Sequence, residues 1–383
     1  MSLQSTYLDH AATTPLRPQA RAALDAWVDA ANASSAHLPG QAARAALEEA
    51  REQIADALGC LPTEVVFTSG ATEADNLAVK GVLWAAREQG RDHLVISGVE
   101  HLAVAEPARW LADRGEARLT VVPPQPDGRV EVERVLAAIE PTTALVSVMA
   151  ANNELGAVND VATLGAALAD GDVALHCDAV QAVTTRQVDV GAWGVDALAL
   201  SAHKIGGPQG VGVAVLRRGL PVVPLSHGGG QDRDVRSGTF AVGLDVAMAA
   251  ALEATAAERD DLDERLRRLS GRLADGATAI DGVHRNGPAD DAWRLSSHVH
   301  LSLEAADPDA LRLELDRAGL AASTGSACAS GAGHASPVVT ACGIDGTPLR
   351  LSLGWTSTEE DVDRALDVLT DVVPRVRLRL SLS

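Results

Sequence analysis

The chain of 383 residues contains few aromatic residues, few lysines and few cysteines. Aromatic side chains make up only 2% of the residues, so a core must be built mainly from alanine, valine and leucine. Four cysteines without a CxxC pair predict no disulfide framework. Lys80 and Lys204 are the only lysines among 32 basic residues, so the presence of each one needs an explanation.

Long apolar runs and a positive net charge are absent as well. No apolar stretch approaches the roughly 20 residues of a membrane span, and residues 1–10 lack the basic and apolar regions of a signal peptide. The formal net charge of −20 would repel a phosphate backbone. We therefore expect a reduced, cytoplasmic protein that binds neither a membrane nor nucleic acid directly.

From about residue 40, helical periodicity alternates with short, wholly apolar strands. This pattern predicts an α/β fold, with a mostly parallel sheet that is covered by helices on both faces. Ligands of such sheets bind beyond the carboxyl ends of the strands. The predicted strands are Glu64–Thr68, His93–Ile96, Arg118–Val122, Ala144–Met149, Val173–His176, Ala197–Leu200 and Val211–Leu216.

A long helical stretch over residues 244–274 ends this alternation. Two strands and two helices follow it, which indicates a smaller α+β domain. The strands are predicted at 298–303 and 349–353, and the helices at 307–318 and 358–372. We predict a large domain over 14–255 and a small domain formed by 1–13 and 256–383, which carries a mobile loop at 323–336.

The first predicted strand leads through Ser69 and Gly70 to Ala71 and Thr72, where a helix begins. The free N–H groups of such a helix start can bind an anion. No lysine of the Walker A type follows, so a nucleoside triphosphate is not expected. An ordinary helix cap is the alternative interpretation.

Polar residues also follow three other predicted strands. Asp178 needs a partner so close to a buried strand, unless it caps a helix. His101 and the cluster 152–154 follow two more strands, and each could instead be structural, as a packed histidine and a turn.

Lys204 follows an apolar strand directly, beside His203. A lysine in a desolvated cleft is a nucleophilic amine, and its usual use is a Schiff base with a carbonyl cofactor. Pyridoxal phosphate needs such a lysine, a phosphate cradle and a carboxylate for its pyridine nitrogen. Lys204, the stretch 70–72 and Asp178 supply these three parts, so we predict this cofactor.

Cys328 is the only cysteine in a segment of small residues, and a mobile thiol there could carry a group to and from the cofactor. A passenger thiol is one alternative. Metal binding with His334 is another, but no second pair of residues has ligand spacing, and we predict no metal site.

Several motifs along nearly the whole chain resemble cysteine desulfurases of the NifS/IscS type. These enzymes belong to the class-V aminotransferase family and to the fold-type-I pyridoxal-phosphate enzymes. The motifs that carry the resemblance are Tyr7–Pro15, Phe67–Glu73, Asn152–Glu154, Ser201–Lys204, His227–Gln231, Arg236–Thr239, Ser323–Cys328 and Leu349–Gly354.

The resemblance implies a role for each matching residue. Lys204 would bind the cofactor and act as a base, His101 would stack on the ring, and Cys328 would accept the sulfur as a persulfide. Arg350, helped by Asn32, would bind the substrate carboxylate. Further cofactor contacts are implied for Ala71, Thr72, Asn153, Asp178, Gln181, Ser201, His203 and, from a second subunit, Thr239.

The implied function is conversion of L-cysteine to L-alanine in a homodimer. The sulfur would pass to an acceptor protein, such as an iron–sulfur scaffold or a thiolation enzyme. The stretch 328–350 resembles the group with a long cysteine loop, although residues 334–337 depart from its usual sequence. A selenocysteine lyase, another aminotransferase-like enzyme, and a non-catalytic sulfur-relay protein remain alternatives.

Overall fold

The computed structural model describes residues 5–324 and 336–380, and its largest sheet has seven strands. β8 runs antiparallel to both of its neighbours, and the other neighbouring pairs are parallel. This arrangement confirms the predicted α/β fold. The strand order is β2 (Val65–Thr68), β8 (Gly212–Leu216), β7 (Ala197–Ser201), β6 (Ala174–Asp178), β5 (Thr143–Ser147), β3 (His93–Ser97) and β4 (Arg118–Val122).

Burial explains why these strands read as apolar runs in the sequence. Every residue of β3, β5, β6, β7 and β8 is buried, as expected when helices cover both faces of a sheet. Only the edge strand β4 exposes a large part of its residues. The six strands other than β8 run in one direction, so their carboxyl ends lie on one side of the sheet.

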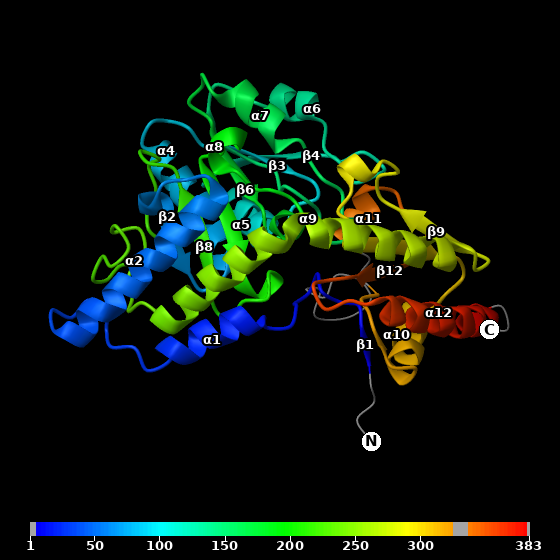
Figure 1. The fold of residues 1–383 in the computed structure, drawn as a ribbon. Helices are drawn as coiled ribbons and strands as arrows, with labels where there is room; N and C mark the ends of the chain where they lie inside the picture. Colours follow the sequence, from blue (N-terminus) through cyan, green and yellow to red (C-terminus); the bar gives the residue numbers. More distant parts are fainter. Residues whose placement is uncertain (1–4, 325–335, 381–383) are drawn as a thin grey trace.

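Eight helices of the described residues accompany this sheet (Figure 1). The predicted helix over 72–87 begins at Ala71, and a π-helical turn, Leu77–Gly81, joins its two α-helical parts. The eight helices are α1 (Pro18–Trp27), α2 (Leu38–Leu58), α3 (Ala71–Asn76), α4 (Val82–Arg87), α5 (Leu102–Asp113), α6 (Val132–Ala137), α7 (Val161–Leu168) and α8 (Val190–Trp193).

α2 shows how local sequence sets a helix and its buried face. The side chain of His37 accepts a hydrogen bond from the Gly40 N–H at its start, and Pro39 has the backbone angle of a first helical turn. Gly59 ends the helix with a φ of 64°, a left-handed conformation that suits glycine. The buried side chains include Leu47 and Ile54, which lie in the core of the large sheet.

A second, three-stranded antiparallel sheet lies apart from the first and has its own core. Its strand order is β12 (Thr347–Ser352), β10 (His298–Leu303) and β9 (Val283–Asn286). The helices α10 (Pro308–Arg317), α11 (Pro337–Ala341) and α12 (Glu359–Leu380) accompany this part of the chain, and the short strands β1 (Thr6–Tyr7) and β11 (Leu320–Ala321) pair in parallel.

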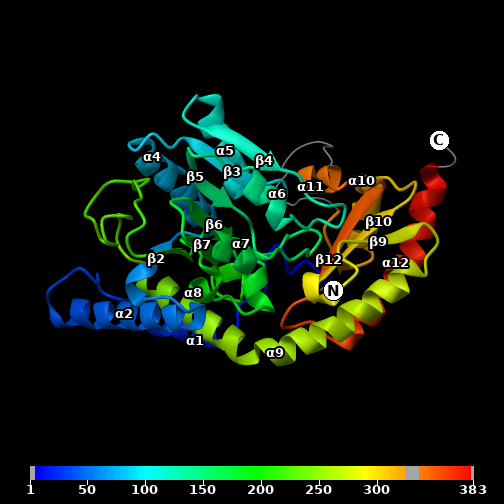
Figure 2. The same cartoon turned by 90° about the horizontal axis from the view of Figure 1, so that it is seen from above.

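α9 (Val242–Thr278) runs along both parts of the molecule (Figure 2). It packs against α1 and α2 with its first half and against α12 with its second half. Ala247 and Ala251 lie in the core of the large sheet, whereas Leu266 and Leu273 lie in the second core. The helix passes without a break through the predicted boundary at 255/256, and the domain limits stay a prediction.

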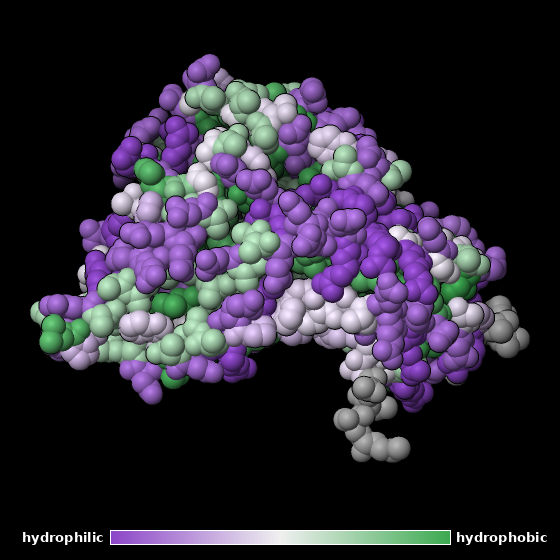
Figure 3. Space-filling model, in the orientation of Figure 1, coloured by the Kyte–Doolittle hydropathy of each residue, from purple (hydrophilic) through white to green (hydrophobic). Residues whose placement is uncertain are grey.

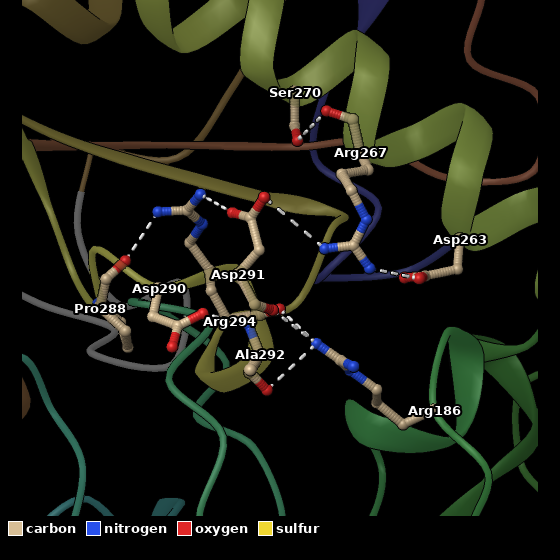
Figure 4. A network of polar contacts seen from close by, with 9 residues as sticks. All are labelled: Arg186, Asp263, Arg267, Ser270, Pro288, Asp290, Asp291, Ala292 and Arg294. Atoms are coloured by element: carbon tan, nitrogen blue, oxygen red, sulfur yellow. Dashed lines mark hydrogen bonds and ion pairs between the residues drawn. The ribbon is translucent and has the colours of Figure 1, made fainter.

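A polar network joins the segment 288–294 to α9 and to Arg186 of the large-sheet part (Figure 4). Arg186 donates hydrogen bonds to the main-chain oxygens of Asp291, at 2.9 Å, and Arg294, at 2.8 Å. Arg267 of α9 contacts both Asp263 and Asp291. Since the segment leads into β10, these contacts tie the second sheet to the first.

Figure 3 shows that hydrophilic residues cover much of one face, while hydrophobic residues gather over α1 and α2. Val28 and Leu38 of that region are 66% and 79% exposed. Among the helices that the structure describes, none combines the length and apolar character needed to cross a membrane. The predicted loop 323–336 falls mostly outside the described residues, and so do Cys328 and His334.

Candidate active site

A cavity of about 490 Å³ lies at the carboxyl ends of the parallel strands of the large sheet. Most of the residues predicted for the site line this one cavity. They are Ala71, Thr72, His101, Asn153, Asp178, Gln181, Ser201, His203, Lys204 and Arg350.

Three predicted residues are not among the lining residues. Asn32 and Thr239 are exposed, in the loop between α1 and α2 and in the segment before α9, and Cys328 lies outside the described residues. Their roles stay predictions. The second lysine, Lys80, is half-buried, and its ammonium group lies 4.8 Å from the centre of the Trp110 ring.

The turn between β2 and α3 forms a tight backbone cradle at the cavity. Gly70 has a φ of 151° and a ψ of 175°, a combination that only glycine adopts readily. A Cβ on Gly212 of β8 would lie 2.6 Å from the Gly70 Cα, so the two backbones meet without room for a side chain. Ala71 and Thr72, the first residues of α3, line the cavity, and the first N–H groups of a helix have no partner within it.

Glu73 connects this cradle to the motif that contains Thr239. Its carboxylate accepts hydrogen bonds from the Ser69 N–H, at 2.6 Å, and from Arg236 Nε, at 3.0 Å. Burial alone would raise the pKa of Glu73, but these hydrogen bonds lower it overall. The ionised carboxylate therefore holds the start of the cradle and the segment around residue 236 together.

Lys204 ends the short 3-10 turn that follows β7. Its Nζ donates to the main-chain oxygens of Ala11, at 2.5 Å, and Ala12, at 2.8 Å. Gln181 Nε2 donates to the same Ala11 oxygen at 3.1 Å. Burial, together with the nearby Lys204 charge, lowers the pKa of His203 to about 4, so its imidazole is neutral near pH 7.

Asp178 is the last residue of β6, and only 5% of its surface is exposed. Its Oδ1 accepts a hydrogen bond from the Val180 N–H at 2.9 Å. The strand-end position that the sequence predicted is thus confirmed, and the carboxylate faces the same cavity as Lys204.

Arg350 of β12 reaches the cavity from the second sheet. Its Nη2 lies 2.6 Å from Asp9 Oδ1, and its Nη1 donates to the Asn153 main-chain oxygen at 3.0 Å. The Arg350 Nε is buried and has no hydrogen-bond partner among the described residues. A guanidinium has five N–H groups, and the contacts to Asp9 and Asn153 use two of them, so further N–H groups of Nη1 and Nη2 remain for a ligand.

Sequence reasoning assigned no role to four residues that the structure places here. The main-chain oxygens of Ala11 and Ala12 hold Lys204, and Asp9 pairs with Arg350. Their motif, 7–15, was recognised without a function. Asp75 also lines the cavity, and nothing in its helical context distinguishes it from a surface carboxylate.

Comparison with known proteins adds an independent result. The aminotransferase class-V family model matches residues 6–365. An IscS-like cysteine desulfurase of Mycobacterium tuberculosis is 46% identical, over 97% of each chain. The chain belongs to the class-V aminotransferase family, among its cysteine desulfurases.

Two solved structures extend this comparison to the fold. A structure described as a NifS-like protein has a TM-score of 0.90 and 31% identity, and covers 97% of this chain and 100% of its own. A structure of SspA in complex with cysteine has a TM-score of 0.80 and 32% identity, with 91% and 98% covered. The fold-type-I architecture is therefore shown for this chain.

The family implies the use of pyridoxal phosphate, and the cavity fits this group. Gly70, Ala71 and Thr72 line the cavity, so a phosphate there would meet the start of α3, as in anion sites at helix starts. Lys204 offers an amine for the aldehyde, and Asp178 offers a carboxylate for the pyridine nitrogen.

Proposed function

We propose that the chain binds pyridoxal phosphate through Lys204 and converts L-cysteine to L-alanine, with the sulfur passing to Cys328. One observation carries the proposal. The amine of Lys204, the carboxylate of Asp178 and the guanidinium of Arg350 all face a single cavity, although they come from three separate strands or strand ends. Amine, carboxylate and guanidinium match the aldehyde and ring nitrogen of the cofactor and the carboxylate of an amino acid.

When bound, pyridoxal phosphate supplies an electron sink that stabilises negative charge at the substrate Cα. The chain's own residues provide the remaining parts. Arg350 binds the substrate carboxylate with the N–H groups of Nη1 and Nη2 that its contacts to Asp9 and Asn153 leave over. Lys204 Nζ would move the proton at the substrate Cα, and His101, at the start of α5, would stack on the cofactor ring and assist proton transfer.

Sulfur transfer requires a thiolate, because the neutral thiol is a poor nucleophile. The thiolate of Cys328 attacks the substrate sulfur, an S–S bond forms, and the C–S bond breaks with its electron pair left on carbon. Proton transfer to that carbon completes alanine. The described cysteines are poorly suited to this role, because burial raises the pKa of Cys60 to about 12, that of Cys342 to about 11, and that of Cys177 well above its usual value.

We also propose a homodimer in which Thr239 contacts the cofactor phosphate of the partner chain. Thr239 is exposed and does not line the cavity of its own chain, yet its segment is tied to the cradle through Arg236 and Glu73. The exposed position of Asn32 also agrees with a contact between chains. The exposed side chains of Val28 and Leu38 beside it offer apolar area for such an interface.

Mass spectrometry after incubation with L-cysteine tests the reaction. We expect free alanine and one additional sulfur atom on the peptide that contains Cys328. The variant Cys328→Ser should bind the cofactor normally but form no persulfide, whereas Cys342→Ser should behave as the wild type. Alanine and sulfide formation at the normal rate in Cys328→Ser would refute the acceptor role.

Complementation between inactive chains tests the shared site. Lys204→Ala and Thr239→Ala lose different halves of a site, so a mixed dimer has one complete site if Thr239 acts across the interface. Activity that returns after the two variants are unfolded and refolded together would support the arrangement. No recovery, with mixed dimers demonstrated, would refute it.

The final acceptor, either an iron–sulfur scaffold or a thiolation enzyme, and the cytoplasmic location remain predictions from the sequence. Both follow from the proposed persulfide, which needs a protein that accepts sulfur and a compartment that keeps thiols reduced.

A further inference from the structure

A second carboxyl group, that of Asp75, lies in the cavity wall beside Asp178. Asp75 is on α3 and is completely buried. One ligand atom each of Asp75, His101 and Asp178 lie within 4.8 Å of one another. Neither carboxyl oxygen of Asp75 has a hydrogen-bond partner among the described residues. A buried carboxyl group without such partners is costly, and its position needs an explanation.

His176 is the nearest group that can pair with it. It precedes Asp178 by two positions on β6, so both side chains lie on one face of the strand. His176 is also completely buried, and its Nδ1 lies 2.8 Å from the Ser147 Oγ on the neighbouring strand β5. Its Nε2 has no hydrogen bond and lies 3.3 Å from Asp75 Oδ1, close enough for a proton between them.

The surroundings decide how many protons this pair holds. Burial raises the pKa of Asp75 well above its usual range, and Asp178 raises it further. Burial lowers the pKa of His176, against the opposing effect of Glu100 and Asp178. The titratable groups whose charges act on the pair are Asp178, Glu100 and His101. Cys177, between His176 and Asp178, points to the opposite face of β6.

The raised pKa of Asp75 and the lowered pKa of His176 mean that the proton between the two side chains is bound to the carboxyl group of Asp75. Asp75 is then neutral and donates to His176 Nε2, while the proton on His176 Nδ1 is donated to Ser147. Two adjacent ionised carboxylates would repel each other in this dry wall. With Asp75 neutral, Asp178 can be ionised without a like charge beside it.

We propose that Asp75 and His176 form a neutral, proton-sharing pair that leaves Asp178 as the ionised carboxylate of this wall. Asp75 is thus a positioning residue, since it acts through Asp178. The assignment rests on the proposed function only in taking Asp178 as the partner of the cofactor nitrogen.

The first test uses the cofactor-free protein with ¹⁵N-labelled histidine. We expect the His176 ring to be neutral, with its proton on Nδ1 and no titration across neutral pH. The signal is assigned by its loss in His176→Gln. An imidazolium ring, or a proton on Nε2, would overturn the proposal. The spectrum is recorded on the wild-type protein and does not depend on the proposed reaction, and the variant serves only to assign the signal.

The second test compares two variants by the dissociation constant of pyridoxal phosphate, followed by absorbance. Asp75→Asn keeps a neutral donor for His176 and should bind the cofactor within about threefold of the wild type. Asp75→Leu removes the donor and should weaken binding by about tenfold. Equal losses in both variants would mean that Asp75 acts as a charge, and no loss in Asp75→Leu would mean that it has no positioning role.

The two tests also separate this inference from the proposed function. If the cofactor does not react with Lys204, the proposed function is refuted. The spectrum of the cofactor-free protein still tests the protonation state of His176 independently.

Discussion

Replacement of Arg350 by lysine should weaken substrate binding specifically. The Arg350 side chain is 6% exposed, and two of its nitrogens are held by Asp9 and by the Asn153 main-chain oxygen. This fixes the plane of the guanidinium, which can meet a carboxylate with two N–H groups. A lysine keeps the positive charge but not the fork, and it cannot hold Asp9 and the substrate in the same geometry.

The magnitude follows from the number of hydrogen bonds. A hydrogen bond to a charged group contributes about 1.5–3 kcal/mol. Loss of one such bond, about 2 kcal/mol, lowers kcat/KM by about 30-fold, and loss of both in Arg350→Ala lowers it by about a thousandfold. The effect should lie mainly in KM, because the carboxylate is bound before and during the reaction.

Alanine production at varied L-cysteine concentration measures these constants, with cofactor absorbance as a check that the site is loaded. Arg118→Lys is a matched control, since Arg118 is half-exposed and pairs with Glu140 at 2.6 Å on the edge strand β4. It should leave both constants unchanged. An unchanged KM in Arg350→Lys, or a loss confined to kcat, would refute the carboxylate-binding role.

Three further predictions concern ionisation, packing and thiol chemistry. Burial raises the pKa of Glu100 from 4.5 to about 7. The free energy of unfolding is therefore unaffected by this group below pH 4.5 and decreases by about 3 kcal/mol as the pH rises to 7, because the unfolded state loses the proton first. Denaturant unfolding between pH 4.5 and 7 measures this change in the free energy of unfolding. Glu100→Gln should abolish the decrease, whereas the exposed control Glu106→Gln should leave it in place. A decrease of the same size in the wild type and in Glu100→Gln would contradict the prediction. Gly212→Ala would place a Cβ 2.5 Å from the Leu200 main-chain oxygen. Such a clash costs about 1–3 kcal/mol, so the dissociation constant of the cofactor, measured by absorbance titration, should rise about tenfold. An unchanged dissociation constant would mean that the cradle tolerates the contact. Iodoacetamide at about pH 7.5 should leave the thiols of Cys60, Cys177 and Cys342 unmodified in the folded protein, because their raised pKa values keep them protonated. Rapid labelling of any of the three in a peptide map would contradict these raised pKa values.

Periodicity identified the large sheet because its strands are buried on both faces. Two strands, Arg118–Val122 and His298–Leu303, have the bounds that the sequence predicted. α1 was not predicted, although one of its faces has helical apolar spacing and packs against the core of the large sheet, with Ala20, Ala23, Leu24 and Trp27. β9 was missed because three of its four residues, His284–Asn286, are not fully buried.

The site was predictable where chain order alone places residues together. In a parallel sheet, Asp178 and Lys204 must lie on one side because each follows the end of a strand. The pair of Asp9 and Arg350 joins positions 341 residues apart, and no local pattern encodes such a contact. The burial of Asp75 likewise depends on which face of its helix packs against the sheet.

The most direct test of the whole account is borohydride reduction of the protein loaded with pyridoxal phosphate, followed by peptide mapping. The chain has only two lysines, so the outcome is unambiguous. We predict a reduced pyridoxyl group on the peptide that contains Lys204. A label on the peptide of Lys80, or on neither lysine, would contradict the central claim.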